Sequence, residues 1–318
     1  MKNALLLCLM WMMSVSASFA QGYPAKPVRF IVPYPPGGGT DLLARTLGAK
    51  ISEPLGQQVV VENRSGAQGN IGTSVAAKSP PDGYTILLSY VGTFAINPWL
   101  YQNVGYDPLK DFSHVSLATV QPYVVVVNPG VPVKNLKELA DLARSRPDRL
   151  TFASSAAAGQ LAGELFKILT NTKMLHIPYK GAGPAVIDLI GGHVDLMFAS
   201  PTSSIPQVKG GKLRALAVTA PARISALPDV PTSKESGFPD FEISGWYGVA
   251  APANTPRDIV MRLNSEFARA LKSKDVREHL LTDGLEAKSS SPEEMAAFVK
   301  SEFDRWGKVV KASGMRVE

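Results

Sequence analysis

Apolar, β-branched runs alternate along the chain with longer segments whose apolar residues recur at helical spacing. This alternation is typical of strand-helix-strand units around parallel sheets, so the pattern predicts the α/β class. The expected strands are residues 28–32, 58–61, 85–89, 123–127, 150–153, 194–198 and 214–219. The expected helices are residues 41–51, 136–145, 159–170, 182–191, 256–272 and 292–312. No internal repeat, coiled-coil heptad or low-complexity tract accompanies them.

The distribution of proline and glycine bears on domain organisation. Both residue types are spread through short loops rather than pooled in one linker, which argues against domains joined like beads on a string. A chain of this length usually forms two domains, and two extended apolar stretches, near 118–122 and 244–250, are natural crossing points between them. We therefore expect lobe 1 to comprise residues 21–120 plus 246–318, and lobe 2 to comprise residues 121–245.

The first twenty residues have the pattern of a secretory signal peptide. Lys2 precedes an apolar run over residues 4–15, and the small residues Ser18 and Ala20 suit cleavage before Gln21. The apolar run is well short of the roughly 20 residues that a membrane-spanning helix needs, although an uncleaved anchor is the alternative. We therefore expect residues 1–20 to be a signal peptide, cleaved near Ala20, and the protein to reside in the periplasm.

Cysteine content and charge exclude several classes of function. Cys8 is the only cysteine and lies in the expected signal peptide, so the mature chain has no thiol for catalysis, metal binding or disulfides. The formal net charge is +6, but Lys and Arg are scattered singly rather than clustered to neutralise phosphates. We therefore expect no nucleic-acid partner, and the mild positive charge favours anionic ligands without identifying one.

The segment YPPGGGTD, residues 34–41, follows the first expected strand and precedes a helix. Consecutive glycines let backbone N–H groups approach a ligand, and the helix start offers unpaired donors and partial positive charge. Asp41 is a plausible N-cap or first-turn acid, and a carboxylate is the expected guest of this loop. The spacings of phosphate-loop and dinucleotide-binding motifs are absent, and a turn with nothing bound is the alternative.

Polar residues also follow the expected strand at 85–89. Open α/β sheets bind ligands beyond the carboxyl ends of their strands, which makes Ser89, Tyr90 and Thr93 hydrogen-bonding candidates. Ordinary loop polarity is the alternative.

A second turn of small residues, FASSAAAGQ over residues 152–160, has the same strand-turn-helix arrangement in the other lobe. Ser154 and Ser155 lie where the strand ends, and N–H groups of residues 156–159 lie near the next helix start. Two such loops facing one another across a cleft would hold both ends of a short acid. Further along, Tyr179 and Lys180 could equally contact a ligand or face solvent.

Seven short motifs occur in a fixed order along the chain: PPGGGTD, ENRSGAQGNIG, DGYT, INP, LAGELF, PYKGAGPAVIDLIGGHVDLMF and KLRALAVT. Together they resemble the receptors of tripartite tricarboxylate transporters, the Bug family, over about residues 23–314. The resemblance implies a two-lobed Venus-flytrap fold, a type II-like periplasmic-binding-protein fold with the ligand cleft between the lobes. It also implies residence in the periplasm, a carboxylate ligand and two integral-membrane transporter subunits as partners.

The resemblance also implies contact residues, while two positions depart from the family pattern. The turn before LAGELF is about three residues shorter than usual, with Gln160 in place of a His, and Ala199-Ser200 replaces a frequent acidic residue. Both departures fall on the lobe 2 side of the cleft. The expected ligand-binding residues are Gly37, Gly38, Thr40, Asp41, Ser89, Tyr90, Val91, Gly92, Ser154, Ser155, Ala156, Tyr179 and Ala199.

Catalytic chemistry has little support in the sequence. Four histidines are scattered without paired spacing, and HExxH, GxSxG and Cys-rich motifs are absent. We therefore expect a monomeric receptor, with no enzyme activity, cofactor or metal, for a di- or tricarboxylate, an aromatic acid or an acidic amino acid. Two alternatives stay open: a ligand-binding sensor for a signalling partner, and a secreted carboxylate-processing enzyme using, for example, Asp41 with His176.

Overall fold

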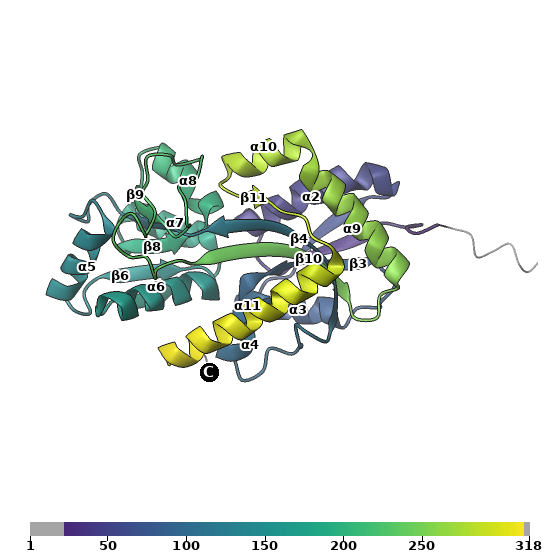
Figure 1. Cartoon of the computed structure of the whole chain (residues 1–318), viewed down its shortest axis with the longest axis horizontal. Coiled ribbons are helices and arrows are strands. Elements are labelled where there is room, and N and C mark those ends of the chain that lie inside the picture. Colours follow the sequence, from purple (N-terminus) through teal and green to yellow (C-terminus); the bar gives the residue numbers. More distant parts are fainter. Residues whose placement is uncertain (1–21, 315–318) are drawn as a thin grey trace, which may run out of the picture.

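The computed structural model describes residues 22–314, so the expected signal peptide and Cys8 lie outside the described residues. Two sheets surrounded by helices form two lobes, and the long strands β4 (Phe112–Pro122) and β10 (Ser244–Pro252) extend from one toward the other (Figure 1). Within residues 22–314, no helix combines the length and apolar character needed to cross a membrane.

The first sheet has six strands in the order β11-β4-β10-β3-β1-β2. β1 pairs in parallel with β2 and β3, whereas β10 is antiparallel to β3 and β4. β3 is buried along its whole length, which accounts for its continuous apolar run in the sequence. Besides β4 and β10, the strands of this sheet are β1 (Val28–Val32), β2 (Val59–Asn63), β3 (Thr85–Tyr90) and β11 (Glu286–Ala287).

The second sheet has five strands in the order β7-β6-β8-β5-β9. β6 is parallel to β7 and β8, and β5 is antiparallel to β8 and β9. The four valines of β5 are all buried, as expected for a strand inside a sheet that is covered on both faces. The strands are β5 (Val124–Val127), β6 (Thr151–Ser154), β7 (Leu175–Pro178), β8 (Leu196–Ala199) and β9 (Arg214–Val218).

Helices connect the parallel strands and cover the sheets (Figure 1). Around the first sheet they are α2 (Gly39–Leu55), the 3₁₀ turn η1 (Ala67–Gly69), α3 (Asn70–Ala77), the π-helical turn η2 (Gly92–Ile96), α4 (Asn97–Leu100), α9 (Arg257–Lys272), α10 (Lys274–Thr282) and α11 (Pro292–Ser313). Around the second they are α5 (Leu136–Ser145), α6 (Ala157–Thr170), α7 (Ala182–Gly191) and α8 (Pro201–Lys209).

The two connections between the lobes are tied together by hydrogen bonds. β4 and β10 pair antiparallel, with Ser244 opposite Pro122 at the end where both chains leave the first sheet. Beyond that point, the backbone N–H of Tyr123 donates to the buried Thr219 hydroxyl over 2.8 Å, and that hydroxyl donates to the carbonyl of Ile243 over 2.5 Å. The chain segments therefore pass between the lobes as one joined unit.

A shared apolar core also joins the lobes. One cluster of buried side chains includes Phe30 of the first sheet together with Phe152 and Phe198 of the second. Near it, the carboxylate of the buried Glu302 accepts hydrogen bonds from the indole N–H groups of Trp246 and Trp306, over 3.2 and 3.0 Å. This buried charge is therefore hydrogen-bonded, as its removal from water requires.

The predicted elements are largely confirmed by the structure. The strand at 28–32 has the predicted bounds, and the other six predicted strands differ by at most two residues at either end. All six predicted helices are present. Strands β4 and β10 were not predicted, since their glycines, prolines and polar residues obscure the strand pattern and left them as extended crossing stretches.

The buried His114 on β4 predicts how stability depends on pH. Desolvation lowers the pKa of His114 from 6.5 to about 4, because its ring is buried against Phe94 and its Nδ1 has no hydrogen-bond partner in the described structure. The unfolded chain therefore binds this proton more readily, so stability is complete above pH 6.5 and falls toward pH 4, by up to about 3 kcal/mol.

Urea unfolding should show that the free energy of unfolding falls less across this pH range for His114→Leu than for the unchanged protein. The control is His193→Gln, which alters an exposed histidine and should leave the pH dependence unchanged. Equal pH dependence in the unchanged protein and His114→Leu would contradict the assignment.

Candidate functional site

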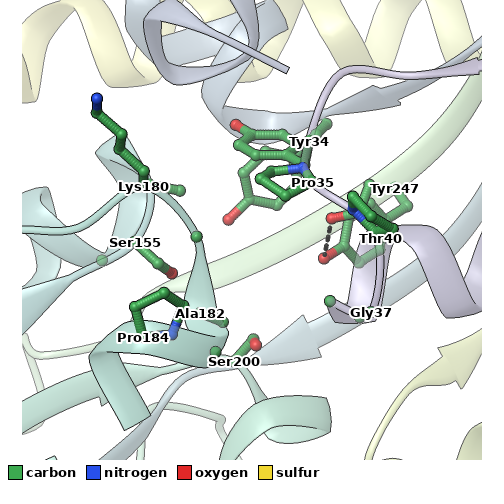
Figure 2. Close-up of a pocket in the computed structure, with 18 of the residues that line it drawn as sticks. Tyr34, Pro35, Gly37, Thr40, Ser155, Lys180, Ala182, Pro184, Ser200 and Tyr247 are labelled. Atoms are coloured by element: carbon green, nitrogen blue, oxygen red, sulfur yellow. Dashed lines mark hydrogen bonds between the residues drawn. The ribbon is translucent and has the colours of Figure 1, made fainter. Parts of the chain in front are cut away.

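A cavity of about 340 Å³ lies between the two lobes. One wall is the loop before α2 with the first turn of that helix, and the opposite wall comes from the starts of α6, α7 and α8 (Figure 2). Tyr90, Tyr123 and Tyr247, which come from β3, the β4–β5 junction and β10, line the cavity between these walls. The cavity therefore lies beyond the carboxyl ends of β1, β3, β6 and β8, where open α/β sheets bind ligands.

Four helices begin at the cavity wall without a side-chain cap. Their N-cap residues are Gly38 for α2, Ala156 for α6, Gly181 for α7 and Ser200 for α8, and none accepts a capping hydrogen bond through its side chain. All four N-cap residues line the cavity. The first turn of a helix carries unpaired N–H donors and a partial positive charge, so these four starts create a favourable environment for an anion.

Asp41 fixes the shape of the glycine loop and does not line the cavity. Its carboxylate accepts hydrogen bonds from the Gly37 N–H, the Arg45 side chain and the Asn63 amide, each over 3.0 Å. Burial opposes ionisation of Asp41, but the hydrogen bonds from Arg45, Gly37 and Asn63 outweigh it and lower the pKa. Gly37 has φ +82°, a conformation that favours glycine and lets the loop turn here.

Tyrosine side chains from lobe 1 and from the β4–β5 junction line the cavity. Tyr90 stacks on Tyr247 with ring centroids 5.1 Å apart, and Tyr34 meets Tyr90 edge-on at 5.6 Å. The hydroxyls of Tyr90 and Tyr123 are 2.6 Å apart, and the Thr40 hydroxyl donates to that of Tyr247 over 3.3 Å (Figure 2). Burial raises the pKa of all four phenols, so they stay neutral and can donate hydrogen bonds at physiological pH.

On the lobe 2 side, Ser155 lines the cavity while its neighbour Ser154 is fully buried. The Ser154 hydroxyl lies 2.7 Å from Nε2 of His176, and this pair holds the strand end behind the loop. The Tyr179 hydroxyl donates to Asp188 over 2.7 Å.

The sequence-predicted residues divide into two groups. Those that line the cavity are Gly37, Gly38, Thr40, Tyr90, Ser155 and Ala156, while Tyr179 lines an adjoining cavity. Those that line neither cavity are Asp41, Ser89, Val91, Gly92, Ser154 and Ala199. In the second group, Ser89, Val91, Ser154 and Ala199 are completely buried.

Several lining residues were not among the predicted set: Tyr34, Pro35, Pro36, Gly39, Tyr123, Gly159, Lys180, Gly181, Ala182, Gly183, Pro184, Phe198, Ser200 and Tyr247. The sequence contains a feature that could have identified some of these residues. Ser200 follows a predicted strand directly, so the rule that selected Ser89 and Ser154 also applies to it. Tyr123 and Tyr247 gave no such signal, because they reach the cavity only through the pairing of distant segments.

The catalytic pair suggested from the sequence is not assembled in the structure. Asp41 pairs with Gly37, Arg45 and Asn63 while His176 pairs with Ser154, so the suggested Asp41–His176 pair does not form. Ser154 and His176 lie at hydrogen-bond distance, but Ser154 is fully buried and lines neither cavity. No group of three or more His, Cys, Asp or Glu residues suited to a metal occurs within residues 22–314.

The lobes touch on both sides of the cavity. A Cβ atom at Gly181 of lobe 2 would lie 3.5 Å from Cγ of Pro35 in lobe 1. A Cβ atom at Gly39 of lobe 1 would overlap the side chain of Thr202 in α8. These approaches define a closed arrangement of the two lobes.

Residues 43–315 match the protein family described as tripartite tricarboxylate transporter family receptor. The chain belongs to this receptor family. Its structure is similar to that of the periplasmic binding protein BugD, with a TM-score of 0.88 and 37% identity, covering 93% of this chain and 100% of that one. The expected family and the two-lobed periplasmic-binding-protein fold are therefore confirmed.

Two further solved structures similar to this receptor contain an acid. An R. palustris protein with adipate is 39% identical, with a TM-score of 0.90, covering 92% of this chain and 99% of that one. The protein MatC from Rhodopseudomonas palustris, with bound malate, is 33% identical, with a TM-score of 0.86, covering 91% of this chain and 100% of that one.

The hydrogen bonds of Asp41 predict that this residue stabilises the folded receptor. Asp41→Asn replaces one of the two acceptor oxygens by an NH2 group that faces other donors, and it takes away the carboxylate partner of Arg45. We expect a loss of about 1–3 kcal/mol at pH 7, measured by urea unfolding. Because the pKa of Asp41 is lowered in the folded protein, its contribution is complete above the unfolded pKa and is lost as pH falls through the folded one.

The matched control is Asp275→Asn, which removes an exposed ion pair with Lys50. This variant should unfold close to the unchanged protein. If both variants lost stability to the same extent, the proposed role of Asp41 in holding the loop would be wrong.

Proposed function

We propose that this receptor, once exported to the periplasm, captures a small carboxylate in the cavity and delivers it to the two membrane subunits of a tripartite transporter. The observation that carries the proposal is the convergence of four uncapped helix starts on a cavity where none of the lining residues within 22–314 is Asp or Glu. The adipate and malate in two similar structures support the same class of ligand.

The donors at the cavity suit a carboxylate because its two oxygens can accept several hydrogen bonds at once. Each helix start contributes roughly half a positive charge, and α2 faces α6, α7 and α8 across the cavity. An acid held between these helix starts accepts hydrogen bonds from N–H groups of both lobes. Neutral phenols complete the lining without adding negative charge.

The lining also discriminates within the class of carboxylates. A buried ammonium group needs a negative partner, and in the part of the chain that the structure describes no acidic side chain lines the cavity to supply one. Where the family resemblance implies an acidic residue, this chain has Ala199-Ser200, and Ser200 lines the cavity. We therefore propose a carboxylic acid without an amino group as the ligand.

The transport role requires that binding be linked to a change of shape. An acid that contacts both lobes binds the closed form more tightly than an open one, so it shifts the population toward closure. We propose that membrane subunits respond to this closed form and that the ligand is released without chemical change.

A thermal-shift panel tests the ligand class. Di- and tricarboxylates and aromatic acids are compared with aspartate, glutamate and diamines of similar size. An acid at 100 times its Kd should stabilise the native form by about 2.7 kcal/mol and raise Tm by roughly 4 °C. Amino acids and diamines should give little shift, and the bound acid should be recovered unchanged. A shift by diamines but not by acids, or turnover of the acid, would overturn the proposal.

A second test concerns closure. Gly39→Ala places a methyl group where the Thr202 side chain lies in the closed form, so the lobes cannot approach as closely. For the acid with the largest thermal shift, calorimetry should show affinity reduced by about tenfold or more, because binding is coupled to closure.

The double variant Gly39→Ala with Thr202→Ala removes the opposing side chain and should recover most of the affinity. Unchanged affinity in Gly39→Ala alone would mean that the ligand is held without this closed arrangement.

A further inference from the structure

A buried amide donor on β4 lies next to the tyrosines of the cavity. Gln121 is 2% exposed, and its Oε1 accepts a hydrogen bond from the Thr119 hydroxyl over 3.4 Å. Its Nε2, however, meets no acceptor in hydrogen-bond geometry within residues 22–314. A buried donor without an acceptor lowers stability, so this amide calls for a role other than holding the fold.

The pairing of β4 with β10 brings the amide to two phenols. Gln121 lies opposite Gly245, and Tyr247 follows two residues later on the same face of β10. A Cβ atom at Gly245 would lie 3.3 Å from Nε2 of Gln121 and 3.4 Å from the Tyr123 hydroxyl. The space left by the missing side chain at Gly245 is therefore where the amide approaches the tyrosines.

The Tyr247 hydroxyl is the oxygen that this amide nitrogen faces. Burial raises the pKa of Tyr247, while the side chains of Thr40 and Gln121 both oppose the rise. A donor has this effect because it stabilises the phenolate oxygen, whereas the oxygen of an amide does not. The Thr40 hydroxyl donates to the same phenol over 3.3 Å, at the start of α2 (Figure 2).

Two donors directed at one phenol oxygen determine where its own proton can point. The oxygen accepts through its lone pairs and carries a single O–H, so this O–H must be directed away from Thr40 and Gln121. Within residues 22–314, the Tyr247 hydroxyl donates no hydrogen bond. Since Tyr247 lines the cavity beside the start of α2, its O–H can be offered to an anion held there.

We propose that Gln121 is a positioning residue that turns the Tyr247 O–H into the cavity, where it donates to the bound carboxylate. This inference rests on the proposed function, since the acid at the start of α2 is the acceptor. Gln121 does not itself line the cavity, so it acts through the phenol. The role explains why a buried amide is directed at the tyrosines although it adds little to the stability of the fold.

Calorimetry with two single variants and their double variant tests this role. The probe is the acid that gives the largest shift in the thermal-shift panel, which includes adipate and malate. Tyr247→Phe removes the donor and should weaken binding by about tenfold, the size of one hydrogen bond to a charged group. Gln121→Met removes the amide with little change in size and should weaken binding by about threefold to fivefold. The double variant should bind like Tyr247→Phe alone, because Gln121 acts through that hydroxyl.

Urea unfolding separates this role from a structural one. Gln121→Met loses an unpaired buried amide, so its free energy of unfolding should be unchanged or higher although its binding is weaker. The control Gln102→Met replaces an exposed glutamine of lobe 1 and should alter neither binding nor stability.

Three results would overturn the proposal. They are unchanged or tighter binding by Gln121→Met, additive losses in the double variant, and a loss of stability that accompanies the loss of binding. If the amide oxygen faced the phenol instead, Gln121→Met would free the Tyr247 O–H, and the acid would bind more tightly. If no acid binds the unchanged receptor, the proposed function itself fails, and that result is distinct from the other three.

Discussion

A carboxylate that leaves water must meet hydrogen-bond donors already in position, because a buried charge without partners is costly. Here the available donors are backbone N–H groups at the starts of α2, α6, α7 and α8. These donors cannot titrate or change rotamer, so the fold itself sets the polarity of the cavity. The small residues of the loops follow from this constraint, since a bulky side chain would keep a ligand away from the backbone.

Residues that do not line the cavity fix the loops that do. Asp41 accepts the N–H of Gly37 from behind the glycine loop, and Ser154 is held by His176 behind the opposite one. Behind each loop, a buried polar side chain forms its hydrogen bonds with groups of its own lobe and is therefore not available to a ligand. This explains why polar residues next to a binding loop can be essential to its shape without contacting what it binds.

The sequence was informative wherever local pattern determines structure. The strand at 28–32, the helix after it and the turn at Ser155 were predictable, because β-branched runs, helical spacing and glycine-rich turns are local features. Tyr123 and Tyr247 were not, since they reach the cavity through the long-range pairing of β4 with β10. The orientation of Asp41 was also beyond prediction, because Asn63, which helps to hold it, lies on a different strand.

The same pairing of β4 with β10 constrains how the cavity can open. Gly245 packs so closely that a Cβ there would lie 3.3 Å from Gln121 and 3.4 Å from the Tyr123 hydroxyl, so the two connections cannot slide independently. Under the proposed closure, the lobes move by bending this joined pair. Bending in one direction separates the start of α2 from those of α6, α7 and α8, and its reversal brings the donors of both lobes to the same ligand. Binding energy and closure thus depend on the same contacts, so a ligand that reaches only one lobe has no means to favour the closed form.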